Sequence, residues 1–358
     1  MQAVRLTANA GRALPLAVAA VLLAAGTSHA YDDTKKPPAK QQGGDHDRTI
    51  DASAAGYRLT YSSGGPSTTN KPLRSSDVTW TPPPCWFGPK YTAEQFKAEY
   101  TTNFNKELPD VTGTFRTAMG MDRDHYANGL DYPDEKGYKD FNVADNDKGQ
   151  WWAVSVNPNA DPVAQMSCND ERPQWVLNGQ RPRGGTQHVI SAEMLSRLAY
   201  AATQVPGVTV QVNPRGVQTV NIATWTWLKQ KYTTVSVRAS VDLGGGQEIW
   251  AETTARPASV HITPGTPYAK LFPRSGDCPI GAGGQVGAPY DGDAKADPPC
   301  GVTYLAPTTN RPPFQLDVTA KWDVSWSGSD GTRDRPLPEG VIDDPRDVTV
   351  QEYQSVNR

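Results

Sequence analysis

The sequence predicts a mainly β protein with some helix, an α+β chain whose C-terminal half is a β-sandwich. Short stretches in which apolar and polar residues alternate with period two dominate from Val208 onward. Glycine and proline separate these stretches, which is typical of many short strands joined by turns. Two amphipathic patterns with helical spacing precede them. The 358 residues suffice for about two domains at roughly 150 residues each.

The first 30 residues have the three-part layout of a secretory signal peptide. Arg5 and Arg12 carry the only charges, Ala13–Ala25 is small and apolar apart from one proline, and Ser28-His29-Ala30 supplies a small-residue cleavage site. The apolar run is shorter than the roughly 20 residues of a membrane-spanning helix, which disfavours the alternative of an uncleaved anchor. We therefore expect a secreted, extracellular protein, with association to the cell envelope left open.

The charge of the chain argues against a nucleic-acid partner. Loss of the signal peptide lowers Lys+Arg from 35 to 33 against 38 Asp+Glu, so the formal net charge changes from −3 to about −5. A weakly acidic protein has no electrostatic attraction to a polyphosphate backbone. No later stretch is apolar over 18 residues, so no transmembrane segment is expected in the mature chain.

Four cysteines indicate two disulfide bonds in an exported protein. Cys85, Cys168, Cys278 and Cys300 allow three pairings. Cys85–Cys168 and Cys278–Cys300 are favoured because each pair lies within one predicted domain. Their spacings match no zinc-binding template.

The domain organisation is predicted as four segments. Residues 1–30 are the signal peptide, 31–76 a flexible polar spacer, 77–205 a small α+β region with two amphipathic helices, and 206–358 the β-sandwich. Within the spacer, Tyr57–Tyr61 alternates and is a candidate for a lone strand.

Two helices are predicted in the α+β region. Thr92 and Gln95 form a candidate capping box, and an aromatic stripe every four residues follows, which we interpret as core packing. Ser191 is the expected cap of a second helix over Ala192–Gln204. The acidic segment Tyr126–Gly149 is expected to be a long loop, and Trp151–Val156 a strand. The aromatic stripe consists of Phe96, Tyr100 and Phe104.

The predicted strands of the C-terminal half follow one another at short intervals. They are Val208–Val212, Val217–Trp227, Val235–Ala239, Gln247–Ala255, Ala258–Thr263, Gly301–Leu305, Leu316–Ala320, Trp322–Trp326 and Val348–Val356.

Three of these stretches resemble a known family. The run Asn213–Trp227, the Cys300-Gly-Val-Thr-Tyr304 strand and the Trp322-Asp-Val-Ser-Trp326 strand are similar to those of uncharacterised secreted proteins of actinobacteria such as Streptomyces. Those proteins carry a PKD-like, immunoglobulin-type (Ig-like) sandwich. The resemblance covers about residues 208 to 356 and departs from the pattern at Ala223, where the family has proline. It implies a fold and an extracellular location but no catalytic residue.

The strand faces fit the implied sandwich. Trp225 and Trp227 share one face of their strand, as do Trp322, Val324 and Trp326. We expect the two tryptophan-bearing strands to face each other across a core about 10 Å thick.

The common catalytic and nucleotide-binding motifs are missing from the sequence. It has no Gly-x-Ser-x-Gly, His-Glu-x-x-His or phosphate-loop pattern. Gly281-Ala-Gly-Gly284 lacks a following lysine and helix, so no nucleotide is expected.

One candidate acid/base group lies in the acidic loop that is expected over Asp122–Asp140. His125 with Asp122 and Asp131 has the residue types for proton transfer, but a solvated loop is the interpretation that we favour.

Calcium is a second candidate ligand. Asp145 with Asp147, and Asp291 with Asp293, bring together the hard oxygens that calcium prefers. Neither pair lies in an EF-hand loop, and ordinary turn chemistry is the alternative. No other cofactor is expected.

Trp151-Trp152 is a candidate glycan contact. Neighbours on a strand face opposite sides, so one indole ring is available to stack on a sugar unless both faces are buried.

Two functions from different classes remain open. The first is a non-catalytic secreted protein with an interaction or structural role at the cell envelope, where its partner is a protein or a glycan. The second is a secreted hydrolase or glycan-binding module that acts on a cell-wall polymer, with His125, Asp122 and Asp131 as the candidate acid/base residues.

Overall fold

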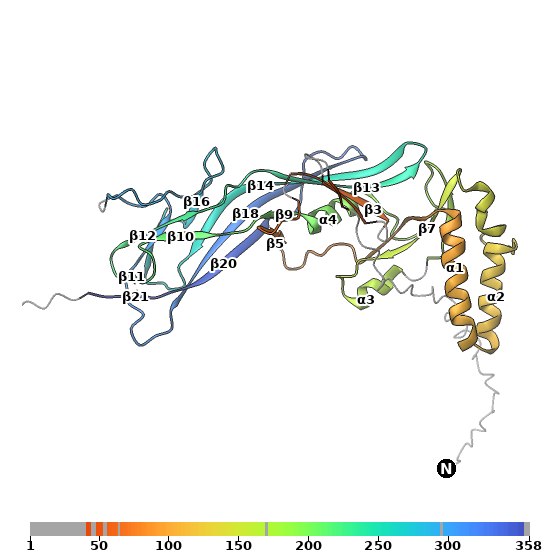
Figure 1. Cartoon of the computed structure of the whole chain (residues 1–358), viewed down its shortest axis with the longest axis horizontal. Helices are drawn as coiled ribbons and strands as arrows, with labels where there is room; N and C mark the ends of the chain where they lie inside the picture. Colours follow the sequence, from red (N-terminus) through yellow and green to blue (C-terminus); the bar gives the residue numbers. More distant parts are fainter. Residues whose placement is uncertain are drawn as a thin grey trace, which may run out of the picture.

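The computed structural model describes residues 41–43, 48–52, 56–63, 65–168, 171–293 and 296–353. The predicted signal peptide and the beginning of the predicted spacer lie outside the described residues. Within these ranges, none of the helices combines the length and apolar character needed to cross a bilayer. Strands predominate, and the molecule is elongated, with a helical hairpin at one end and a small sheet at the other (Figure 1).

The largest element is a curled antiparallel sheet of ten strands. Its main path is β1 (Gln41–Gly43), β2 (Arg48–Ala52), β3 (Tyr57–Ser63), β13 (Val235–Gly244), β14 (Gln247–Thr263), β18 (Phe314–Gly328), β20 (Gly340–Val348) and β5 (Arg74–Ser75), with β16 (Asp277–Pro279) on β14 and β19 (Arg335–Pro336) on β18. The long β14–β18 pair runs along most of the molecule (Figure 1).

Period-two burial explains why β14 and β18 are so long. Every second residue of β18 from Leu316 to Trp326 is buried, so the strand covers two hydrophobic clusters with one face. The predicted strands Leu316–Ala320 and Trp322–Trp326 are therefore one strand. Similarly, the strands predicted over Gln247–Ala255 and Ala258–Thr263 join into β14.

A bulge keeps one face of β14 inward. The buried positions are odd-numbered up to Ala255 and even-numbered from Val260. The pairing with β18 shifts between Pro257 and Ser259, so Ala258 is the extra residue. Without it, the second half of the strand would point its apolar side chains to the wrong face. Pro257, which lacks an N–H group, lies at the point where the ladder is interrupted.

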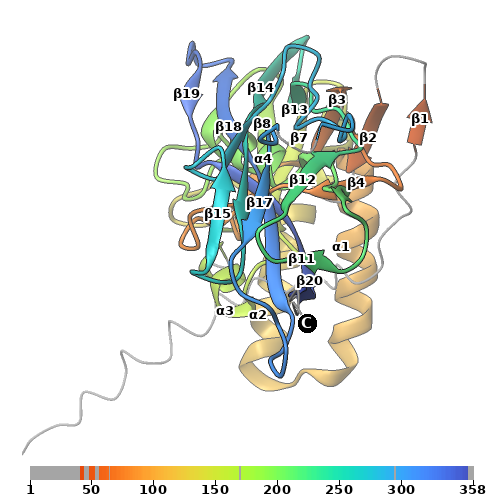
Figure 2. The same ribbon diagram turned by 90° about the vertical axis from the view of Figure 1, so that its left-hand side faces the viewer.

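Four strands form a second sheet that faces β14, β18 and β20. They are β10 (Val210–Asn213), β12 (Ala223–Leu228), β17 (Gly301–Tyr304) and β15 (Ala269–Phe272), in that order. Leu228 and Val302 from this sheet share one buried cluster with Ile262 and Trp322 from the large sheet. The chain also forms the short pairs β11 (Gln218–Thr219) with β21 (Val350–Gln351) and β4 (Asn70–Pro72) with β9 (Gln204–Pro206). Figure 2 shows the small sheet from its own end.

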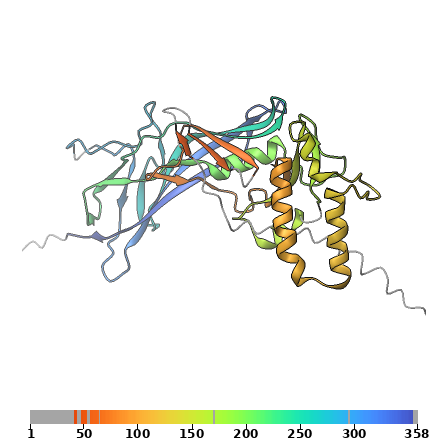
Figure 3. The ribbon, with the colours of Figure 1, turned by 45° about the vertical axis from the view of Figure 1, so that its right-hand side comes forward.

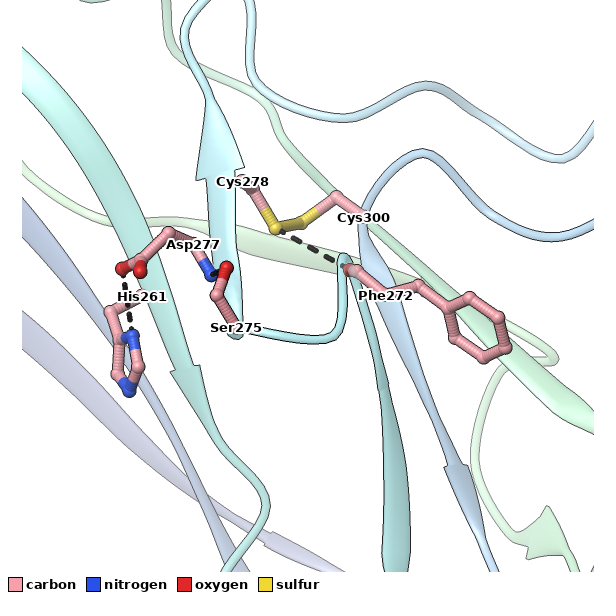
Figure 4. The surroundings of a disulfide bond; sticks show 6 residues. All are labelled: His261, Phe272, Ser275, Asp277, Cys278 and Cys300. Carbon is pink, nitrogen blue, oxygen red and sulfur yellow. Dashed lines mark hydrogen bonds and ion pairs between the residues drawn. A yellow bond between two sulfur atoms is a disulfide. The ribbon is translucent and has the colours of Figure 1, made fainter.

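A disulfide bond links the two sheets. Cys278 lies on β16 of the large sheet, and Cys300 directly precedes β17 of the small one (Figure 4). A second disulfide joins Cys85 and Cys168. Both predicted pairings are confirmed.

The predicted orientation of one tryptophan pair is wrong. Trp322 and Trp326 are buried inside, but Trp225 and Trp227 lie on the opposite face of β12 from Leu228, which is the core residue. Trp225 is instead covered from outside by Tyr290, with ring centroids 5.4 Å apart. The inward positions of β12 are taken by Thr224, Thr226 and Leu228, so the Trp-bearing faces do not meet.

The helical end combines a three-stranded sheet with a helical hairpin (Figure 3). The sheet consists of β6 (Cys85–Tyr91), β7 (Gly149–Val156) and β8 (Gln174–Leu177). The hairpin consists of α1 (Ala93–Glu107), the short 3-10 helix η1 (Leu108–Asp110) and α2 (Gly113–Ala127). Next come η2 (Asp140–Asp145), α3 (Pro162–Gln165) and η3 (Met166–Cys168). The capping box of Thr92 and Gln95 is confirmed, with both hydrogen bonds present.

The second predicted helix is confirmed as α4 (Ala192–Ala202), capped by the Ser191 hydroxyl, and it ends two residues earlier than expected. Leu195 packs in one cluster with Val237 and Ala251 of the large sheet. The hydrophobic core therefore crosses the predicted domain boundary at residue 206.

The prediction that the spacer extends to residue 76 is corrected by the structure. Tyr57–Ser63 forms β3, which pairs with β13, and Leu59 and Tyr61 are buried in the same cluster as Leu195. The alternating stretch Tyr57–Tyr61 is thus a strand as predicted, but it is not a lone one, because β3 lies between β2 and β13 in the large sheet.

We expect the inter-sheet disulfide to contribute about 3 kcal/mol to stability, because it closes a loop with a sequence separation of 22 residues. Replacing both Cys278 and Cys300 by alanine should lower the free energy of unfolding by that amount in urea titrations. If the double variant unfolds at the same urea concentration as the oxidised wild type, this expectation is contradicted.

Candidate functional site

An aromatic cluster attaches the helical hairpin to the three-stranded sheet. Phe96 of α1 lies at its centre and stacks on Trp151 of β7, with centroids 4.3 Å apart. Tyr126 of α2 and Phe141 of η2 pack edge-on against Phe96 at 5.3 and 5.9 Å. The Trp151 indole N–H donates to the Phe141 carbonyl at 2.9 Å. The predicted core packing of the aromatic stripe on α1 therefore holds at its N-terminal residue, Phe96.

His125 lies behind this cluster, fully buried in α2. Its Nδ1 is 2.7 Å from the Leu130 carbonyl oxygen, which can only accept, so Nδ1 carries a proton. Its Nε2 lies 3.6 Å from Glu135 Oε2, too far for a hydrogen bond, and has no hydrogen-bond partner among the described residues. The Tyr132 ring stacks on the imidazole at 4.2 Å and covers it.

Glu135 is the polar centre of the helical end, with its side chain 4% exposed. Tyr138 Oη donates to Glu135 Oε1 at 2.5 Å, and Arg183 Nη2 donates to Oε2 at 3.0 Å. Arg183 also donates through Nη1 to the Asp134 carbonyl and through Nε to Gln174. These bonds anchor the segment after β8 against the acidic segment before β7.

A pocket of about 210 Å³ lies between β8 and the returning segment Gln180–Arg183. Trp175 lines it and is partly exposed, together with Tyr138 and Leu177. Arg181 and Arg183 line it as well, and no carboxylate does. Trp175 is the cross-strand partner of Trp151, and its centroid lies 5.7 Å from that ring, so the buried cluster holds the exposed indole in place.

The edge of β8 adds a main-chain donor to this pocket. Asn178 N–H donates to the Lys148 carbonyl of the neighbouring chain segment, so in an antiparallel pair the N–H of Leu177 points away from β7. Gly149 on β7 makes this packing possible: an added Cβ would lie 2.5 Å from the Val176 carbonyl oxygen and 2.9 Å from the Trp175 ring.

The predicted acid/base residues do not converge on a solvent-accessible point. The prediction that His125 lies in a loop is wrong, because α2 extends to Ala127. Asp131 is exposed and accepts from Lys136 at 2.6 Å, and this hydrogen bond lowers the pKa of its carboxyl group. Asp122 accepts from Tyr100 Oη at 2.6 Å. Each of the three side chains has its own structural partner.

Both candidate glycan-contacting tryptophans are buried. Trp151 is 0% and Trp152 1% exposed, because one packs under the hairpin and the other against the cluster that contains α4. Neither offers a ring face to a glycan, and Trp175 is the tryptophan of this sheet that lines a pocket.

Two of the four aspartates considered for calcium have local partners. Asp145 pairs with Lys148 at 2.6 Å, and Asp291 accepts from the Asp293 backbone N–H at 3.0 Å. Asp147 is exposed, as are Asp291 and Asp293. Across the described ranges, the one group of three candidate ligands is Cys85, Cys168 and His188, and the two sulfurs there are bonded to each other.

Another group of residues has the composition of a hydrolase triad but a different arrangement (Figure 4). His261 Nδ1 lies 2.8 Å from Asp277 Oδ1 across the β14–β16 pair. Ser275 Oγ accepts from the Asp277 backbone N–H at 3.2 Å. The serine is thus bonded to the aspartate's main chain, whereas in a triad the histidine lies between the two.

Comparison with protein families, curated proteins and solved structures finds no match for this chain.

Sequence reasoning missed the residues that form the pocket. One signal was present: Trp175-Val176-Leu177 is followed by Asn178-Gly179, a pattern typical of a strand ending in a tight turn. Gly179 indeed has a φ of +74°. The pairing of Glu135 with Arg183 spans 48 residues and leaves no local pattern.

We expect Glu135→Gln to destabilise the protein by about 2 kcal/mol, because the buried acceptor loses its charge toward both Arg183 and Tyr138. Chemical unfolding of the variant measures this loss. Asp131→Asn is the matched control, since it removes an exposed carboxylate in the same segment and should change stability by less than about 0.5 kcal/mol. Equal effects of the two substitutions would contradict the role assigned to Glu135.

The buried tyrosines predict a loss of stability at alkaline pH. Burial raises the pKa of Tyr132 and of Tyr61 from 10.0 to about 12, with a further contribution from Asp122 for Tyr132 and from Tyr57 for Tyr61. In the unfolded chain they ionise near 10, so the unfolded state binds fewer protons above that pH. The unfolding free energy should be constant up to about pH 10 and fall between 10 and 12. Tyrosinate absorbance followed with and without urea checks the two pKa values.

Proposed function

We propose that this protein is a non-catalytic binding protein of the extracellular space or the cell envelope. In this proposal a β-sandwich of the Ig-like or PKD-like kind, as in the actinobacterial secreted proteins that the strands resemble, is the scaffold. The helical end carries the binding site. The partner is a component of the envelope, either a protein or a glycan.

The two-sheet arrangement and the two disulfides support the scaffold and the location. Two facing antiparallel sheets are the architecture of an Ig-like sandwich, and a disulfide between the sheets also occurs in the antibody domains of this kind. Disulfide bonds persist in oxidising compartments, so export of the chain accounts for both bonds. Signal-peptide cleavage before Tyr31 is part of this proposal.

The single observation that carries the binding function is the partly exposed Trp175 in its pocket. Tryptophan and arginine are the residues most enriched at the energetic centre of binding sites, and both line this pocket. Ligand sites are concave and combine aromatic side chains with a few polar groups, and the lining of this pocket has both. The side chains that line the pocket are held in position by contacts with other residues of the protein, as expected of a preorganised binding surface.

The test is a pull-down of envelope fractions with the exported, oxidised chain. Trp175→Ala should weaken binding by about 2 kcal/mol, or roughly thirtyfold in Kd. Trp227→Ala is the matched control: this tryptophan is also partly exposed but lies on β12 at the other end of the molecule. A parallel experiment with a chelator tests the calcium hypothesis for the four aspartates.

Two results would contradict the proposal. Wild-type protein that is folded and oxidised but retains nothing from any envelope fraction would exclude the binding role. Equal retention by the wild type and the Trp175 variant would place the binding site elsewhere in the molecule.

A further inference from the structure

We infer that the pocket at Trp175 binds a carboxylate-bearing sugar ring, such as a uronate unit of an anionic glycan. The inference rests on the proposed binding function and names the ligand class of that site. Three features of the pocket support it: the charge of its lining, its aromatic wall and its size.

The charge of the pocket comes from Arg181. Its Nη1 donates to the Ile190 carbonyl at 3.0 Å, which holds the side chain in place. The remaining donors of its guanidinium have no hydrogen-bond partner within the described ranges. Arg183, by contrast, is already paired with Glu135. One guanidinium with a free planar pair of N–H donors is therefore available, and this geometry matches a carboxylate.

The positive charge of the pocket lining contrasts with the negative net charge of the whole chain. The formal net charge is −3, whereas the lining of the pocket contains two arginines and no carboxylate. Glu135, the carboxylate that pairs with Arg183, is buried behind it and is neutralised by it. An anionic group that enters the pocket meets a cation without meeting a like charge.

The aromatic wall favours a sugar over a simple anion. Trp175 is partly exposed on the pocket side and is supported from behind by Trp151. A flat indole face packs well against the C–H face of a pyranose ring. Gln180 also lines the pocket, and its amide can both donate to and accept from a hydroxyl group. The Leu177 N–H on the free edge of β8 provides another donor.

The size of the pocket limits the ligand to a single ring. Its volume of about 210 Å³ is below the roughly 300–1,000 Å³ of pockets that enclose drug-sized molecules. A longer glycan would place one unit in the pocket and extend over the exposed surface. Peptides with a free C-terminal carboxylate satisfy Arg181 but not the ring-shaped wall, so they are the alternative that the experiment must exclude.

The test is isothermal titration of the full, oxidised chain with a galacturonate trimer. A neutral galactose trimer, acetate and a hexapeptide with a free C-terminus are the comparison ligands. We expect binding of the galacturonate trimer, with at least tenfold weaker or no binding of the other three. Arg181→Gln and Trp175→Ala should each weaken galacturonate binding at least about tenfold. Arg274→Gln, an exposed arginine in the loop between β15 and β16, should not change it.

The unfolding temperature of each variant separates loss of the ligand contact from loss of the fold. Arg181→Lys is added as a conservative variant. The lysine variant keeps the charge without the planar fork, so partial binding supports the assignment. The inference is overturned if the neutral trimer, acetate or the peptide binds with the same affinity as the galacturonate trimer. It is also overturned if Arg181→Gln leaves galacturonate binding unchanged. If galacturonate does not bind while envelope fractions are still retained through Trp175, the ligand class is wrong and the proposed function stands. If both fail, the proposed function fails as well.

Discussion

The alternation of buried and exposed side chains along β14 and β18 is the constraint on which the rest of the structure depends. These two strands pair over almost their whole length and supply buried residues to both large hydrophobic clusters. Because side chains alternate strictly along a strand, an uninterrupted β14 would turn the apolar side chains after Ala255 to the outer face. The extra residue at Ala258 restores the inward direction, so that one sheet contributes to both cores.

The two ends of the molecule use this sheet in different ways. At one end the small sheet lies over β14 and β18 and is tied to them by the Cys278–Cys300 disulfide. At the other end α4 packs on the same sheet next to Trp326 and connects it to the strands that hold the hairpin. The folded body is therefore continuous, although the sequence texture changes sharply near residue 206.

The pocket follows from how the helical end is held together. β8 is an edge strand, and the segment after it returns along the free edge because Arg183 bonds Glu135, Asp134 and Gln174. Trp175 lies at this edge, where its ring contacts Trp151 and also lines the pocket. A surface of this kind suits recognition, since its charged groups are positioned by contacts that do not depend on a ligand.

Much of the architecture was determined by local patterns in the sequence. The mainly β character, the caps at Thr92 and Ser191, the alternation in β13, β14 and β18 and both cysteine pairings could be predicted, because they depend on spacing or on proximity along the chain. Three features could not. The bulge at Ala258 interrupts the alternation that predicts a strand, and the outward face of Trp225 depends on which side of β12 meets the other sheet. The alternation at Tyr57–Tyr61 predicts a strand, but its place between β2 and β13 depends on pairing with distant residues.

The candidate site was decided by tertiary structure for the same reason. Trp151 and Trp152 differ from Trp175 only in what packs over them: the hairpin and the α4 cluster cover the first two, whereas the third lies at a free edge. The partners of His125, Glu135 and Arg183 come from segments up to about 50 residues apart. Burial and pairing at such separations depend on the complete fold, whereas a sequence pattern reports only on neighbours in the same helix or strand.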